Sequence, residues 1–254
     1  MTYTDLIFDL YGTLVDIHTE ESPAVWDKCA LFFGFCGVHC TGDELRRDFY
    51  RVLAEREVRA GQDYECFPEV PFEEIMTQRL SEGGVTEGAD ALGVQAAQLF
   101  RICSIEYVRR YPFVTEALTA LRAKGCRLWL LSNAQRVFTA YELRLLGLDG
   151  IFDGIYLSSD YACRKPDGRF YRALLDGQGL DPAHCLMIGN DRETDIAGAQ
   201  RLGLATLYMH TALTPSHQAS ADERLRPDRA PEGCRHFEYE GDEWEELSRL
   251  IGLL

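Results

Sequence analysis

Positive charge is scarce in this sequence, and lysine is especially rare. The chain of 254 residues has 41 aspartates and glutamates against 26 lysines and arginines, a formal net charge of -15. Only Lys28, Lys124 and Lys165 are lysines. Because such a field repels phosphates at a distance, the composition argues against nucleic acid or an anionic membrane as a partner. A small anionic substrate is still allowed, provided that local cations bind it.

Long apolar runs are missing as well. No stretch approaches the roughly 20 apolar residues that a membrane-spanning helix needs. The N-terminal segment MTYTDLIFDLYG has no basic region, and Asp5 and Asp9 interrupt its apolar residues, so it does not read as a signal peptide. We therefore expect a cytoplasmic protein without a membrane partner.

A disulfide or zinc pattern is also lacking. The nine cysteines are odd in number and scattered along the chain. Cys36 and Cys40 could form a metal-binding pair, but no second pair and no histidine follows at the spacing of zinc sites. Reduced thiols in a cytoplasmic compartment explain these cysteines best.

The chain after Pro112 alternates between strand and helix patterns. Buried strands are expected at 126–133, 154–159, 185–190 and 204–211, and helices at 114–125, 137–147, 168–179 and 193–203. Repeated strand–helix units of this kind predict a parallel sheet with helices on both faces. Residues 213–231 are polar and rich in proline, which favours a surface loop or flap. A last strand and an amphipathic helix are expected within 234–254.

The N-terminal part of the chain contributes one strand and then a long helical segment. Residues 3–11 are rich in β-forming residues, and a single strand must join the later sheet to be stable. Residues 22–110 show apolar residues at helical spacing and no convincing strand. The sequence therefore predicts an α/β core with a Rossmann-like sheet, formed by 1–17 and 111–254, and an inserted all-helical cap domain at 18–110.

Polar residues follow the ends of the expected strands. Ligands bind at the carboxyl ends of the strands in an open parallel sheet. One site should therefore collect a carboxylate nucleophile, hydroxyl donors, a lysine and two further carboxylates. The residues in question are Asp9, Thr13, Ser132, Asn133, Lys165, Asp191 and Asp195.

Four motifs in this order resemble the haloacid dehalogenase (HAD) superfamily of hydrolases with a helical cap of the first type. They are DLYGT, SN, RKPDGRFY and GNDRETDIAGA, and the resemblance covers nearly the whole chain. It implies that Asp9 is the nucleophile that forms a covalent intermediate with the substrate. It also implies that Ser132 bonds the transferring group and that Lys165 neutralises charge between nucleophile and substrate.

The fourth motif indicates a metal site. Asp191 and Asp195 lie four residues apart, and clustered with Asp9 they would repel one another unless a cation lay among them. Oxygen ligands favour a hard ion such as Mg²⁺. In the HAD superfamily, which these motifs resemble, the backbone carbonyl two residues after the nucleophile is also a metal ligand. In this sequence that carbonyl belongs to Tyr11. The predicted metal ligands are thus Asp9, Tyr11, Asp191 and Asp195, although one aspartate could instead cap a helix.

Tyr11 divides the functional interpretation. Phosphatases of the resembled family usually have an aspartate there as the general acid and base, whereas the metal-independent 2-haloacid dehalogenases have a tyrosine. Tyr171 also matches a tyrosine of the dehalogenases. Because the metal motif looks intact, we predict a Mg²⁺-dependent phosphatase acting on a small phosphorylated metabolite. A 2-haloacid dehalogenase is the alternative, and a non-catalytic binding protein on the same fold is the second.

The expected cap offers little information on the substrate. Its one lysine, Lys28, lies in an apparent helix, so the Schiff-base chemistry of the related phosphonatases is poorly supported. A basic cluster also falls in this part of the chain, and we expect most of it to be a solvated helix face. Its members are Arg46, Arg47, Arg51, Arg56 and Arg59.

Overall fold

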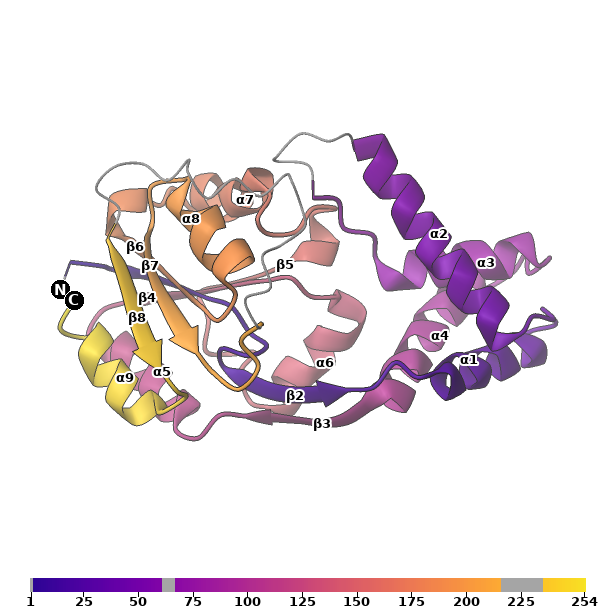
Figure 1. The fold of residues 1–254 in the computed structure, drawn as a ribbon, viewed down its shortest axis with the longest axis horizontal. Coiled ribbons are helices and arrows are strands. Elements are labelled where there is room, and N and C mark those ends of the chain that lie inside the picture. The colour runs from indigo at the N-terminus through magenta and orange to yellow at the C-terminus, as the bar shows by residue number, and fades with distance from the viewer. Residues whose placement is uncertain (1, 61–66, 216–234) are drawn as a thin grey trace.

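A parallel sheet forms the centre of the protein. The computed structural model describes residues 2–60, 67–215 and 235–254. Six strands hydrogen-bond in the order β5-β4-β1-β6-β7-β8, and every neighbouring pair is parallel (Figure 1). The strands are β1 (Asp5–Phe8), β4 (Arg127–Ser132), β5 (Gly154–Leu157), β6 (Cys185–Gly189), β7 (Ala205–His210) and β8 (His236–Glu240). The predicted parallel sheet is confirmed, and the first strand lies inside it, between β4 and β6.

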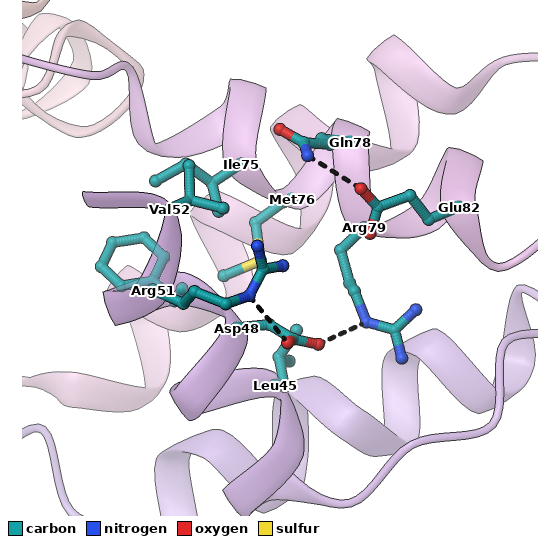
Figure 2. Close-up of a pocket in the computed structure, with 10 residues that line it drawn as sticks. Leu45, Asp48, Arg51, Val52, Ile75, Met76, Gln78, Arg79 and Glu82 are labelled. Carbon is teal, nitrogen blue, oxygen red and sulfur yellow. Dashed lines mark hydrogen bonds and ion pairs between the residues drawn. The ribbon is translucent and has the colours of Figure 1, made fainter. Parts of the chain in front are cut away.

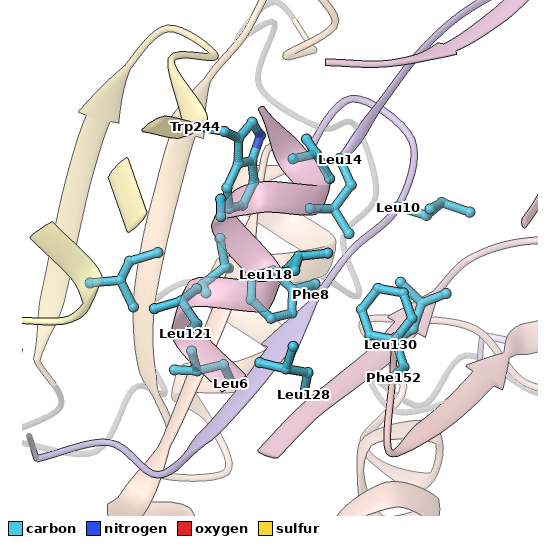
Figure 3. Packing of buried hydrophobic residues seen from close by; sticks show 14 of the residues in the cluster. Leu6, Phe8, Leu10, Leu14, Leu118, Leu121, Leu128, Leu130, Phe152 and Trp244 are labelled. Carbon is cyan, nitrogen blue, oxygen red and sulfur yellow. The ribbon is translucent and has the colours of Figure 1, made fainter. Parts of the chain in front are cut away.

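Helices cover both faces of this sheet. They are α5 (Val114–Ala123), α6 (Arg136–Leu145), α7 (Gly168–Gln178), α8 (Gly198–Gln200) and α9 (Trp244–Ile251). Side chains alternate across a strand, so that Leu6 and Phe8 pack with α5, α6 and α9, while Ile7 packs with α7 and α8. Figure 3 shows the first layer, in which Trp244 of α9 lies above the leucines of α5 and β1.

A helical block is inserted between the first strand and the rest of the sheet. It consists of α1 (Pro23–Phe35), α2 (Gly42–Ala60), α3 (Phe72–Glu82) and α4 (Ala89–Ser104). The block has a core of its own, in which Trp26, Phe72 and Phe100 pack together, with ring centroids 4.7–4.8 Å apart for the pairs Trp26–Phe100 and Phe72–Phe100. In Figure 1 it extends to the right of the sheet.

Helices α2 and α3 of the block are joined by charge as well as by packing. Asp48 of α2 forms an ion pair with Arg79 of α3 at 3.0 Å and a longer one with Arg51 of α2 at 3.7 Å (Figure 2). The cavity beside these residues measures about 10 Å³, no more than a single water occupies. The arginines of the predicted basic cluster at 46, 47, 51 and 56 are exposed, as expected for a solvated face. The side chain of Arg59 lies outside the described residues.

Two strands, β2 (Val15–Thr19) and β3 (Ile105–Arg110), were not expected. The helical pattern was predicted to continue through Arg110, but α4 ends at Ser104 and β3 follows it. This strand pairs antiparallel with β2, with Ile17 opposite Val108. The segment IEYVRR has β-branched and aromatic residues, and a partner strand that is distant in sequence decides its conformation. The two predicted domain boundaries fall in this two-stranded ribbon.

The C-terminal part agrees with the sequence where it is described. Strand β8 and helix α9 confirm the predicted last strand and amphipathic helix. The predicted flap at 213–231 lies outside the described residues, apart from 213–215.

Candidate active site

Asp9 lies directly after β1, and the side chains of Ser132, Lys165 and Thr13 donate hydrogen bonds to its carboxylate. Its Oδ1 accepts hydrogen bonds from Ser132 Oγ at 3.1 Å and Lys165 Nζ at 2.8 Å. Among the described residues, its Oδ2 has a single long hydrogen bond, from Thr13 Oγ1 at 3.4 Å. The turn after Asp9 requires Gly12, which has a φ of +84° and leaves no space for a Cβ beside Asn190. One carboxylate oxygen is thus held firmly, and the other is nearly unoccupied.

Lys165 is the cation of the site. Its side chain is only 1% exposed, and its Nζ lies 2.8 Å from Asp9 Oδ1 and 2.5 Å from Asp195 Oδ1. Burial alone would lower the pKa of Lys165, but the two carboxylates more than offset this and raise the pKa above its ordinary value. The side-chain amide of Asn133 accepts from the Lys165 backbone N–H at 2.7 Å and donates to its carbonyl at 2.9 Å. Asn133 therefore fixes the lysine in place.

The fourth motif begins with a π-helical turn, Arg192–Ala197, where a regular helix was expected. Asp191 is its N-cap: Oδ1 accepts from the backbone N–H groups of Glu193 at 2.8 Å and Thr194 at 2.9 Å. Tyr171 stabilises the same turn, because its hydroxyl donates to the carbonyls of Thr194 and Asp195. A π-turn is a frequent feature of functional sites.

Asp195 is engaged differently from Asp191. Its Oδ1 accepts from Lys165, and its Oδ2 accepts from the backbone N–H of Asp191 at 3.0 Å. Burial raises the pKa of the Asp195 carboxyl, and the Lys165 ammonium opposes this shift. Both oxygens of Asp195 thus face protein donors, which differs from the ligand role that we predicted.

The residues of the predicted metal site are not gathered into a cluster of three acidic ligands. Within residues 2–60, 67–215 and 235–254, no three His, Cys, Asp or Glu side chains lie close enough to hold a metal. A smaller donor set is compatible with the contacts. Asp191 Oδ2 has no hydrogen bond in the described part of the chain. Two carboxylates suffice for Mg²⁺, which keeps several waters and binds substrate phosphate.

The Tyr11 side chain is occupied at the boundary with the helical block. Its hydroxyl donates to Glu142 Oε2 at 2.5 Å and lies 3.0 Å from Thr139 Oγ1. Burial, and then the charge of Glu142, raise the pKa of Tyr11 far above its ordinary value. Arg101 of α4 binds the same carboxylate through two hydrogen bonds of 2.6 and 2.9 Å. A phenol held in this way is a very poor proton donor.

A second contact joins the helical block to the core beside Ser132 and Asn133. Residues 67–70 lie along residues 162–164, with backbone hydrogen bonds from Arg164 N to Phe67 O and from Glu69 N to Ala162 O. Glu69 accepts from Ser158 Oγ and Gln135 Nε2, both at 2.9 Å. Burial raises the pKa of the Glu69 carboxyl. This contact holds the block against the loop that follows β4.

The comparison with known proteins identifies the family. Residues 6–203 match the haloacid dehalogenase-like hydrolase family. The chain belongs to this family of hydrolases. It is 30% identical to a glyceraldehyde 3-phosphate phosphatase of Methanothermobacter thermautotrophicus over 214 residues. This alignment covers 84% of this chain and 88% of the relative. A phosphoserine phosphatase of Thermus thermophilus is 30% identical over 160 residues, 61% of each chain.

Solved structures of this hydrolase family share the fold. A 2-haloacid dehalogenase from Pseudomonas syringae pv. Tomato superposes with a TM-score of 0.62 at 20% identity, covering 99% of both chains. A HAD phosphatase from Thermococcus onnurineus gives a TM-score of 0.58 at 18% identity, covering 99% of this chain and 98% of that one. Identities this low show the architecture alone. Among the described residues, no helix has the length and apolar character needed to cross a bilayer.

The structure brings together most of the residues that the motifs indicated, and it adds others. Asp9, Thr13, Ser132, Asn133, Lys165 and Asp195 form one hydrogen-bonded set. Sequence reasoning missed Glu142, Arg101 and Glu69. None of them belongs to a motif, and they lie far from Asp9 in the sequence. No local signal could have indicated them.

Proposed function

We propose that this hydrolase is a Mg²⁺-dependent phosphatase that acts on a small phosphorylated metabolite through an aspartyl intermediate. One observation carries the proposal: Asp191 stands beside the site as a carboxylate, and one of its oxygens has no hydrogen bond to any described residue. The 2-haloacid dehalogenases of this family have small polar residues in place of the metal-binding carboxylate of the fourth motif. The relatives named as phosphatases, including the one at 30% identity over most of the chain, support the same class.

Asp9 Oδ2 is the attacking atom in this mechanism. Ser132 and Lys165 hold Oδ1, so the lone pairs of Oδ2 remain available to phosphorus. A bond forms between Oδ2 and phosphorus while the bond from phosphorus to the leaving oxygen breaks. Water then attacks the acyl phosphate, which releases phosphate and regenerates the Asp9 carboxylate.

Lys165 and Ser132 stabilise charge during both steps. The Lys165 ammonium donates to Asp9 and compensates the negative charge that the phosphoryl group brings. Asp9, Asp191 and the Tyr11 carbonyl would hold Mg²⁺, which supplies further neutralisation of the phosphate oxygens when it is bound. The helical block, predicted as a cap over 18–110, would cover the site and select the substrate.

A metal-independent 2-haloacid dehalogenase is the second candidate. Tyr11 favours it, as does the lack of a cluster of three acidic ligands in the described residues. Displacement of halide needs no general acid, so the occupied phenol of Tyr11 would not hinder that reaction.

The two candidates separate in one experiment. The enzyme is assayed on 4-nitrophenyl phosphate and on 2-chloropropionate, each with Mg²⁺ and with a chelator. We expect turnover of the phosphate ester with Mg²⁺ only. Asp191→Asn should abolish it, while the amide oxygen still caps the turn, since asparagine is an equally good N-cap. Halide release that persists in the chelator would replace the proposal with the dehalogenase.

A further inference from the structure

Three parts of the chain meet at the Tyr11 hydroxyl. Tyr11 belongs to the loop after β1, two residues from Asp9, and Glu142 belongs to α6 of the core. Arg101 belongs to α4 of the helical block. Glu142 accepts from Tyr11 at 2.5 Å and from Arg101 at 2.6 and 2.9 Å. The block is thus connected to the loop of the nucleophile through one carboxylate.

This connection is buried and charged. The Glu142 side chain is 6% exposed and that of Arg101 is 18% exposed. The Arg101 guanidinium also lies over the rings of Phe138, at 5.4 Å, and Tyr11, at 5.8 Å. Bidentate pairs of this kind are geometrically specific, and loss of one partner leaves an uncompensated buried charge. Small displacements of α4 are therefore resisted here.

Backbone hydrogen bonds also hold the nucleophile loop next to Tyr11: Gly12 N–H donates to the Val15 carbonyl at 2.8 Å, and Thr211 Oγ1 donates to the Gly12 carbonyl at 2.6 Å. The backbone N–H groups of Thr13, Leu14 and Val15 all converge on the Leu10 carbonyl, which forms a tight turn. The Tyr11 side chain projects from this turn, and its hydroxyl contacts are to Glu142 and to Thr139, one turn earlier in α6. Among the described residues, the Tyr11 side chain is thus the point at which α6, and through Glu142 also α4, contacts the peptide unit whose carbonyl we assign to Mg²⁺.

We propose that Glu142 and Arg101 are positioning residues, which together with the backbone pairing to Val15 hold the Tyr11 carbonyl in its place beside Asp9 while α4 is seated on α6. This inference rests on the proposed function, in which the Tyr11 carbonyl is a ligand of Mg²⁺. The contact makes a complete site depend on the position of the helical block. Arg101 thereby couples substrate enclosure to the geometry of the nucleophile loop, without itself touching the reacting atoms.

The test compares two variants that break the connection with one that does not. Tyr11→Phe keeps the ring and the backbone carbonyl but removes the hydroxyl. Arg101→Met removes the guanidinium. The matched control is Asp48→Asn, which breaks the bond to Arg79 between two helices of the block (Figure 2). Mg²⁺ binding is measured by calorimetry, and backbone amide exchange is followed over residues 9–15.

Tyr11→Phe and Arg101→Met should each weaken Mg²⁺ binding by about tenfold, because loss of a residue that hydrogen-bonds to a metal-binding residue commonly has this effect. Both should also speed amide exchange in the loop, and the double variant should lose little more than either single one. Asp48→Asn should change neither quantity. Arg101→Lys keeps the positive charge but cannot form two parallel hydrogen bonds to Glu142, so it should retain part of the Mg²⁺ affinity that Arg101→Met loses. Where Arg101→Met does not fold, Glu142→Gln replaces it.

Unchanged loop exchange in the folded connection variants would overturn the inference, as would equal changes in Asp48→Asn. The exchange measurement needs neither metal nor turnover. If the phosphatase proposal is wrong, the wild-type protein itself will bind no Mg²⁺ and hydrolyse no phosphate ester. Amide exchange in residues 9–15 would still decide whether Glu142 and Arg101 position the loop.

Discussion

Replacement of Lys165 by methionine should destabilise the protein strongly and in a pH-dependent way. The ammonium lies between Asp9 at 2.8 Å and Asp195 at 2.5 Å, and the Lys165 and Asp195 side chains are each only 1% exposed. Removing one partner of a buried ion pair costs about 3–5 kcal/mol of unfolding free energy. For a chain of this size that corresponds to a fall in Tm of about 6–20 °C.

The pH dependence follows from the carboxylates that remain. The pKa of Asp195 is already raised above its ordinary value by burial, and loss of the Lys165 charge raises it further in the folded state only. A carboxyl with a raised folded pKa costs nothing below its unfolded pKa, and it destabilises increasingly as pH rises from the unfolded value to the folded one. Because the pKa of Asp195 is already about 7 in the wild type, the part of the Lys165→Met deficit that comes from Asp195 should grow as pH rises above this value and be absent at acidic pH.

Urea unfolding of wild type and variant in a chelator, at several pH values, measures this deficit. Adding Asp195→Asn to Lys165→Met should recover part of the stability, because one uncompensated carboxylate is then gone. Lys28→Met, at an exposed position of α1, is the control and should be nearly silent in stability and activity. A deficit below about 1 kcal/mol at neutral pH, the range of surface ion pairs, would refute the reasoning, and so would a deficit that grows on acidification.

Two further results are expected. Asp9→Asn should abolish turnover of any substrate and leave the far-UV circular dichroism spectrum unchanged, since the amide has the same shape but is not nucleophilic; substantial residual turnover would make Asp9 a purely structural residue. Aryl phosphates should be hydrolysed much faster than sugar phosphates, because Tyr11, with its pKa raised by burial and by Glu142, cannot protonate an alkoxide. Equal rates for the two classes, with chemistry shown to limit turnover, would mean that another residue supplies the proton.

The sequence alone determined the sheet and the position of the reactive residues. Apolar runs at the spacing of strands and helices are local signals, and right-handed strand–helix units leave few topologies open. Asp9 follows β1, Ser132 ends β4 and Lys165 lies in the segment after β5, so their meeting follows from the parallel order of these three neighbouring strands. The residues of these motifs were therefore identifiable before their contacts were known.

Only the tertiary structure decided how Tyr11, Asp191 and Asp195 are used. Two aspartates four residues apart look equivalent in the sequence, yet Asp195 faces Lys165, whereas Asp191 caps the π-turn with one oxygen and has no described hydrogen bond to the other. Tyr11 meets Glu142, 131 positions along the chain, and through it Arg101. Strand β3 likewise depends on pairing with β2. Contacts between distant residues carry no local period or spacing, because they exist only once the helices have packed against the sheet.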